Sequence, residues 1–145
     1  MASEVVEIQR LYDQLVAAAV GGDPDEYAAL FTGDAVLMPP NAAVIAGRDA
    51  IRAWMRAFFR TWRAEISTLS FDQRQRGDTV AFCRFSASGK YIPVAGGEPF
   101  AFDQKYLDTI VRDASGTWKF AAHMWSSNTR DRSLWAQEVS RHERR

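Results

Sequence analysis

The sequence predicts an α+β fold in which a curved antiparallel sheet forms a cone around N-terminal helices. Most of residues 4–62 repeat apolar side chains at helical spacing, whereas apolar and polar residues alternate after Trp62, as they do in strands. Turn signals divide this second part into four strands, which is typical of an antiparallel meander. Helices that precede a run of antiparallel strands indicate the α+β class.

Two helices and a short extended segment are predicted first. Apolar spacing predicts a helix over residues 4–20, which two glycines end. A second helix begins after Asp23, with Pro24 at its first position, and is expected to run to about Phe31. The stretch "DAVLMPPN" predicts a brief extended segment that ends at its two prolines, which lack the backbone donor of a strand.

The third predicted helix begins near Gly47 and is the most amphipathic. Its apolar stripe suits the inside of the cone and consists of Ile51, Trp54, Met55, Phe58, Phe59 and Trp62. Four arginines occupy the opposite face: Arg52, Arg56, Arg60 and Arg63. A solvated face is the main interpretation of these arginines, and phosphate or partner binding is the alternative.

The strands are predicted at residues 64–75, 79–92, 99–112 and 117–127, separated by the turn sequences "RGD", "AGGE" and "DASG". We therefore expect one domain over residues 1–128, followed by a polar C-terminal tail over residues 129–145 that Trp135 anchors.

The composition of the 145-residue chain excludes several function classes. The formal net charge is zero, so a nucleic-acid surface is not predicted. One cysteine excludes an internal disulfide, and no apolar run is long enough for a membrane span. The N-terminus is unlike a secretory signal, which makes the cytoplasm the expected location. Because phosphate-loop, dinucleotide, HExxH and GxSxG motifs are absent, we predict neither a metal nor another cofactor.

Three stretches of the chain resemble the NTF2-like superfamily, specifically its SnoaL-like and ketosteroid-isomerase-like branch. They are "GGDPDEYAALFTGDAVLMPP", "IAGRDAIRAWMRAF" and "YLDTIVRDASGTWKFAAHMWSSN", and the likeness covers the chain from about Glu4 to Asn128. The resemblance implies the cone-shaped fold with an internal pocket. It does not imply one activity, because this fold hosts isomerases, cyclases, epoxide hydrolases, dehydratases and binding proteins.

The resemblance to ketosteroid isomerase also identifies candidate site residues. The position of its general-base aspartate falls at Pro39, and its oxyanion tyrosine aligns with Leu15, one turn beyond Tyr12. Its protonated aspartic acid aligns with Asp108, which this chain retains. Steroid isomerisation with that set of residues is therefore not predicted.

The last predicted hairpin would place polar groups on the cavity face. A four-residue "DASG" loop pairs Tyr106 with His123 and Asp108 with Ala121, so that Asp108 and His123 are diagonal neighbours. The resemblance implies that Asp108 faces the cavity, so the cavity face is expected to contain Gln104, Tyr106, Asp108, Ala121, His123 and Trp125, and the outer face Leu107, Thr109, Val111, Trp118, Phe120 and Met124.

These residues support two functional hypotheses. The first is a cofactor-independent acid–base enzyme of isomerase, cyclase or dehydratase type that acts on a small apolar carbonyl or polyketide-like substrate. His123 would be the general base, Asp108 a neutral donor or the group that orients His123, and Tyr106 a second donor. The second hypothesis is a ligand-binding or assembly module without turnover, in which the same three residues form a structural network.

Other predicted contacts follow from the periodicity of the elements and from the resemblance. The predicted substrate-binding residues are Trp54, Met55, Phe58, Phe59, Cys83, Phe85, Gln104, Trp125, Tyr12 and Leu15. Relatives commonly dimerise through the convex face of the sheet. A homodimer is therefore expected through the mostly apolar residues that alternate with those of the cavity face and so lie on the other side of the sheet: Val80, Phe82, Leu107, Thr109, Phe120 and Met124.

Overall fold

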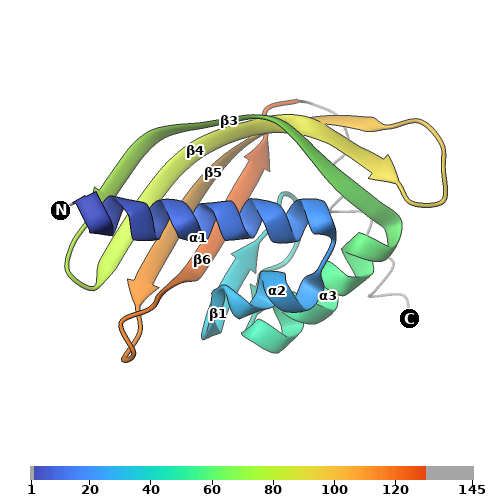
Figure 1. Ribbon diagram of the computed structural model, residues 1–145. Coiled ribbons are helices and arrows are strands. Elements are labelled where there is room, and N and C mark those ends of the chain that lie inside the picture. The colour runs from blue at the N-terminus through green and yellow to red at the C-terminus, as the bar shows by residue number, and fades with distance from the viewer. Residues whose placement is uncertain (1, 130–145) are drawn as a thin grey trace.

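The computed structural model of the protein describes residues 2–129 (Figure 1). Its elements are α1 (Ala2–Gly21), α2 (Pro24–Ala29), β1 (Phe31–Met38), β2 (Ile45–Ala46), α3 (Arg48–Thr61), β3 (Trp62–Arg76), β4 (Val80–Pro93), β5 (Phe100–Arg112) and β6 (Trp118–Ser127). Of the predicted C-terminal tail, residues 130–145 lie outside the described residues, and with them the anchoring role predicted for Trp135.

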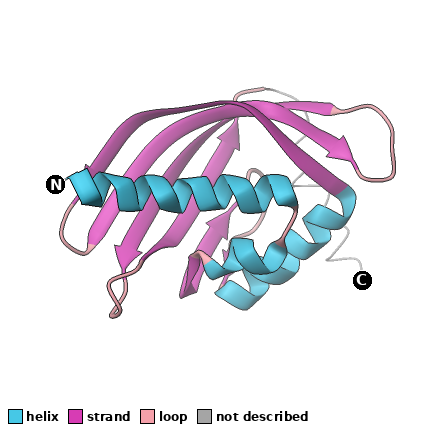
Figure 2. Ribbon diagram, viewed as in Figure 1, coloured by secondary structure: helices cyan, strands magenta, loops and turns pink. Residues whose placement is uncertain are grey.

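Six strands form one curved sheet that does not close, in the order β2-β1-β6-β5-β4-β3 (Figure 2). Strands β3 to β6 form the predicted antiparallel meander. Strand β1 pairs with β6 in parallel, so the sheet is mixed rather than wholly antiparallel. The elements β2, α3 and β3 to β5 separate these two strands in sequence, and such a long connection allows parallel pairing.

The second helix is shorter than predicted. It ends at Ala29, and the strand begins already at Phe31, which the sequence analysis had assigned to the end of the helix. Its start is as predicted, because the Asp23 carboxylate accepts from two backbone N–H groups of the first turn. The aromatic ring of Phe31 packs within the core, and tertiary burial decides the boundary here.

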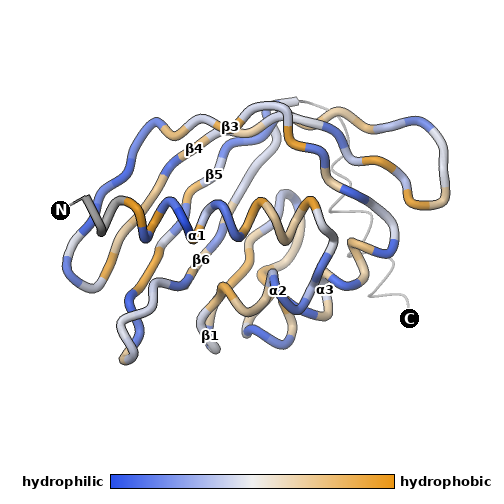
Figure 3. The backbone as a smooth tube through the Cα atoms, viewed as in Figure 1, coloured by the Kyte–Doolittle hydropathy of each residue, from blue (hydrophilic) through white to orange (hydrophobic). Residues whose placement is uncertain are grey.

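The helices cover the concave face of the sheet. Figure 1 shows α1 lying across the strands and α2 with α3 closing one end of the cone. Buried apolar residues of the strands and helices form one core between these layers. Figure 3 shows how hydropathy varies along the elements that contribute to it. On the outer side, the Asp25 carboxylate of α2 pairs with Arg52 at 3.2 Å and Arg56 at 3.7 Å. The main interpretation of the arginine face is consistent with these exposed contacts.

The register of the last hairpin differs from the prediction. Asp108 lies opposite His123 and Tyr106 opposite Trp125, and the register shifts between Thr109 and Ile110. The loop is one residue longer than assumed, which displaces β6 by one position. The irregularity places one more unpaired residue on β6, so the total displacement beyond it is two positions. A displacement of two residues leaves Asp108, Tyr106 and His123 on the face that was predicted.

The longer loop reverses the face at the start of β6. Trp118 and Phe120 were predicted on the outer face, and this prediction is wrong, because both side chains are buried in the core. The extra loop residue displaces the start of β6 by one position, which moves its side chains to the other face, and the irregularity after Phe120 restores the predicted face for the rest of the strand. The convex face therefore loses Phe120 and keeps Val80, Phe82, Leu107 and Met124 as exposed apolar residues.

One glycine is required where β3 bends over the cavity. The β3–β4 register shifts between Ile66 and Thr68, opposite Gly89. A Cβ atom at Gly89 would lie 1.9 Å from the backbone carbonyl oxygen of Glu65, so a larger residue would push the two strands apart.

Candidate active site

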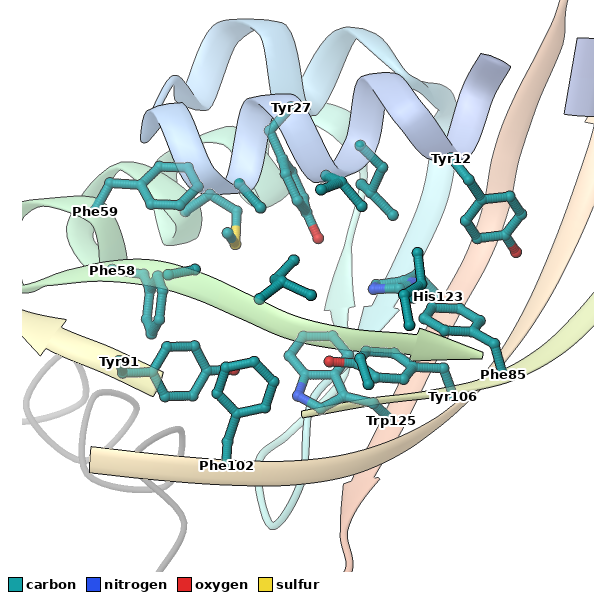
Figure 4. A pocket seen from close by; sticks show the side chains of 18 residues that line it. Tyr12, Tyr27, Phe58, Phe59, Phe85, Tyr91, Phe102, Tyr106, His123 and Trp125 are labelled. Atoms are coloured by element: carbon teal, nitrogen blue, oxygen red, sulfur yellow. The ribbon is translucent and has the colours of Figure 1, made fainter. Parts of the chain in front are cut away.

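A cavity lies between the concave face of the sheet and the helices (Figure 4). Its volume is about 90 Å³, smaller than the roughly 150 Å³ of an apolar protein cavity that holds one benzene molecule. Most lining residues are buried. Tyr106 on β5 is partly buried, and the other lining residues that reach the surface lie on α1 and β3: Val16, Ala19, Ala64, Ile66 and Leu69. The mouth of the cavity is therefore between α1 and β3.

A chain of three polar side chains lies at one end of the cavity. The carboxylate of Asp108 is fully buried; its Oδ1 lies 2.5 Å from Nδ1 of His123, and its Oδ2 accepts from the Tyr12 hydroxyl at 2.5 Å. In the tautomer in which Nδ1 carries the proton, Nδ1 of His123 donates to the Asp108 carboxylate. The other ring nitrogen, Nε2, is then left for the cavity that His123 lines.

Aromatic packing holds this chain in place. The Tyr12 ring makes edge contacts with Phe71, Phe85 and Phe120 at centroid distances of 4.8, 5.3 and 5.3 Å. The His123 ring lies 5.1 Å from Trp125 and 5.5 Å from Tyr106. These contacts come from α1 and four strands, so the trio is fixed by rigid elements rather than by loops.

A second polar group lies on β4 and β5. The Oε1 atom of Gln104 accepts from the Tyr106 hydroxyl at 2.6 Å and from the Tyr91 hydroxyl at 3.2 Å. The Tyr106 ring is stacked on Phe85 with a centroid distance of 4.3 Å. Tyr106 was predicted as a second donor toward the substrate, but in the structure its hydroxyl proton is committed to Gln104.

The structure places most predicted site residues around the cavity. Those that line it are Tyr12, Leu15, Met55, Phe58, Phe59, Phe85, Tyr106, His123 and Trp125. Four others are buried but are not among the lining residues: Trp54, Cys83, Gln104 and Asp108. Asp108 is behind His123 and Tyr12, and Gln104 is behind its two tyrosines.

Tyr27 of α2 is a cavity residue that the sequence analysis missed. Its hydroxyl points into the cavity (Figure 4). The capping pattern around Asp23 located the helix that carries it, but not the direction of this side chain. The one available signal was a large aromatic residue, Tyr27, four positions after the helix cap in a helix of only six residues. A side chain of that size needs a neighbouring element to cover it.

Burial makes the tyrosines of the cavity harder to ionise. Desolvation raises the pKa of Tyr12, Tyr27, Tyr91 and Tyr106 above the ordinary value of a tyrosine. The charge of Asp108 raises the pKa of Tyr12, Tyr27 and Tyr106 further. All four therefore act as neutral hydrogen-bond donors at neutral pH.

This has a measurable consequence, because these are all 4 tyrosines of the chain. We expect no tyrosinate absorbance near 295 nm at pH 10 to 11, where an exposed tyrosine with a pKa of about 10 ionises. Their folded pKa values exceed the unfolded ones, so their contribution to stability is full below about pH 10 and decreases above it. Ionisation is expected to coincide with alkaline unfolding followed by circular dichroism. A tyrosinate signal from a chain that is still folded would contradict this prediction.

Two other observations concern the described residues. No group of three or more His, Cys, Asp or Glu side chains in residues 2–129 is arranged to hold a metal ion. Within the same part of the chain, none of the helices combines the length and the apolar character that crossing a membrane requires.

The comparison with protein families decides the membership of this chain. The sequence model of the SnoaL-like domain matches residues 8–128. The chain belongs to the SnoaL-like domain family. No curated protein matches it.

Solved structures share the fold of this SnoaL-like protein. A ketosteroid isomerase-like protein from Erwinia carotovora atroseptica has a TM-score of 0.80 at 22% identity, covering 89% of this chain and 99% of that one. A candidate dehydratase of the NTF2-like family from Streptomyces avermitilis has a TM-score of 0.77 at 15% identity, covering 89% of this chain and 99% of that one. A candidate scytalone dehydratase from Novosphingobium aromaticivorans has a TM-score of 0.74 at 21% identity, covering 88% of this chain and 86% of that one. At these identities the likeness shows the NTF2-like α+β cone fold.

Proposed function

We propose that the SnoaL-like protein is a cofactor-independent acid–base enzyme that acts on a small, largely apolar carbonyl compound. The observation that carries the proposal is the His123–Asp108 pair at a cavity whose walls are otherwise mostly apolar. A histidine that only fills a core needs no buried carboxylate on one nitrogen and a cavity on the other. This pairing is how proteins orient an imidazole for proton transfer.

His123 is the group that moves the proton. With Nδ1–H held by Asp108, the lone pair of Nε2 can accept a proton from the carbon next to a carbonyl group, which leaves an enolate. Return of that proton to a different carbon gives isomerisation. Loss of a hydroxide from the adjacent carbon, protonated as it leaves, gives dehydration, and attack of the enolate on a second carbonyl carbon gives cyclisation.

Asp108 is a positioning residue in this scheme. Of the two roles predicted for it, the structure favours orientation of His123, because its oxygens are occupied by His123 and Tyr12 and it does not line the cavity. Its negative charge also stabilises the imidazolium that forms when Nε2 accepts a proton. Tyr106 stacks beside the imidazole and limits its rotation.

The proposal is tested by proton exchange rather than by turnover of an unknown substrate. Cyclopentanone is a suitable probe, because it is among the smaller ring ketones, its apolar end can extend into the α1–β3 mouth, and it has exchangeable protons next to its carbonyl group. We expect the protein to accelerate exchange of these protons in D₂O, followed by NMR. Bound probe without any acceleration would contradict the proposal.

A non-catalytic binding module is the second candidate. The position of the family's general-base aspartate falls at Pro39, which is buried after β1 and has no acid–base group. Solved structures similar to this chain include a candidate association domain of a calcium/calmodulin-dependent protein kinase from Thiobacillus denitrificans, at 18% identity and a TM-score of 0.66. Under this hypothesis the probe binds and does not exchange.

We also propose that the protein is a homodimer through the convex face of its sheet. Val80, Phe82, Leu107 and Met124 are each at least 40% exposed and come from three adjacent strands. An apolar patch on neighbouring strands favours self-association of two sheets.

Charged substitutions on this face test the dimer. Light scattering at micromolar concentration is expected to give twice the 16.3 kDa mass of one chain, and the double variant Leu107→Glu with Met124→Glu is expected to give a single chain. Val94→Glu is the matched control, since Val94 is 51% exposed but lies in the β4–β5 loop. A wild-type mass of one chain would overturn the proposal.

A further inference from the structure

Tyr27 provides the cavity with a hydroxyl group that the proposed chemistry does not use. Its side chain is 4% exposed, and its ring is fixed between Phe31, stacked at 5.3 Å, and Phe59, in edge contact at 6.2 Å. The hydroxyl points toward the middle of the cavity (Figure 4). Among residues 2–129, no side chain or backbone group forms a hydrogen bond with this hydroxyl, which lines the cavity.

The other cavity hydroxyls are committed. Tyr12 donates to Asp108, and Tyr91 and Tyr106 donate to Gln104. Tyr27 is therefore the one lining tyrosine within residues 2–129 whose proton is available to a bound molecule. A hydroxyl that faces a cavity can donate its hydrogen bond to an acceptor on a bound molecule.

We propose that Tyr27 recognises the carbonyl oxygen of the bound molecule, with the carbon next to that carbonyl over His123 and the apolar remainder directed to the α1–β3 mouth. This inference rests on the proposed function for the role of His123. It adds the group that selects the ligand by its oxygen atom and the direction in which the ligand lies.

The surroundings of Tyr27 define the chemical class of the ligand. No lysine or arginine is among the residues that line the cavity, and the buried carboxylate of Asp108 is behind one wall. A carboxylate or phosphate ligand would find no counter-charge there, whereas a neutral ketone or aldehyde needs only one donor. The mouth residues are apolar, so they suit an aliphatic or aromatic remainder.

The test compares two probes of the same shape. Cyclopentanone has a carbonyl oxygen where methylenecyclopentane has a CH₂ group, so the ratio of their dissociation constants isolates recognition of the oxygen. In Tyr27→Phe we expect the preference for cyclopentanone to decrease by about 10-fold, the effect of one hydrogen bond. Tyr91→Phe is the matched control, since it removes a hydroxyl of the same cavity that already has an acceptor.

A spectroscopic measurement separates recognition from a structural role. The carbonyl ¹³C resonance of labelled, bound cyclopentanone is expected to move upfield in Tyr27→Phe, because the hydrogen bond that polarises the carbonyl is lost, and to keep its wild-type position in Tyr91→Phe. An unchanged resonance and an unchanged preference in a folded Tyr27→Phe protein would overturn the inference.

The two proposals fail in different ways. If Tyr27→Phe leaves probe recognition unchanged while wild-type protein still exchanges the probe protons, the role of Tyr27 is wrong and the acid–base function stands. If recognition depends on Tyr27 but no exchange occurs, the cavity binds carbonyl compounds without catalysis.

Discussion

Replacing His123 with asparagine is expected to reduce the proton exchange of bound cyclopentanone by about 10²–10⁴-fold, the usual contribution of a general base. Asparagine places an amide N–H group near the position of Nδ1, so Asp108 keeps a donor. It has no group that can accept a proton at neutral pH. The variant therefore removes the proton transfer and largely keeps the hydrogen bond.

Two measurements accompany the rate. The melting temperature of His123→Asn is expected to lie within a few degrees of the wild-type value, because no buried group loses its partner. The dissociation constant of the probe is expected to change little, since Tyr27 and the apolar walls are intact. Exchange at the wild-type rate in His123→Asn would show that another group, or solvent, removes the proton.

Much of the fold could be predicted from local patterns. The aromatic stripe of α3 and the alternation in β3 to β6 determine which faces are buried, and both patterns are visible in the sequence. The parallel pairing of β1 with β6 could not be read in the same way, because pairing between strands distant in sequence depends on how the whole sheet curves.

The polar trio was predicted only in part. The alternation of side chains along a strand placed Asp108 and His123 on one face, and the two-residue error in register did not change that result. Tyr12 was assigned to the cavity without a hydrogen-bond partner. Nothing in the sequence shows that α1 crosses the sheet at the point where Tyr12 reaches Asp108 of β5. The contact spans 96 positions and depends on the curvature of the sheet.

Replacing Asp108 with alanine is expected to cause the largest loss of stability of any single change in the site. It removes the acceptor of Tyr12 and of His123, and each buried donor without a partner costs about 1–3 kcal/mol. The free energy of unfolding should decrease by about 2–6 kcal/mol, which lowers the melting temperature by roughly 5–20 °C for a domain of this size.

An exposed aspartate on the same strand provides the control. Asp103 is on β5 with its side chain on the exposed face, where it accepts from Asn128. Asp103→Ala is expected to change the free energy of unfolding by about 0.5 kcal/mol or less. Equal losses for the two variants would show that the trio contributes no more than a surface hydrogen bond.

A triple apolar variant decides whether the trio is kept for stability or for chemistry. In Tyr12→Phe with Asp108→Leu and His123→Leu, every member is replaced together, so no buried donor or charge is left without a partner. Replacing a complete buried ionic network by apolar residues of similar volume is often neutral or stabilising by about 1–4 kcal/mol. We therefore expect a melting temperature near or above the wild-type value, together with loss of proton exchange. A stable, inactive triple variant would mean that the imidazole and the carboxylate serve the reaction. A triple variant as unstable as Asp108→Ala would mean that the three groups determine the packing of α1 against the sheet, which is what the binding-module hypothesis predicts.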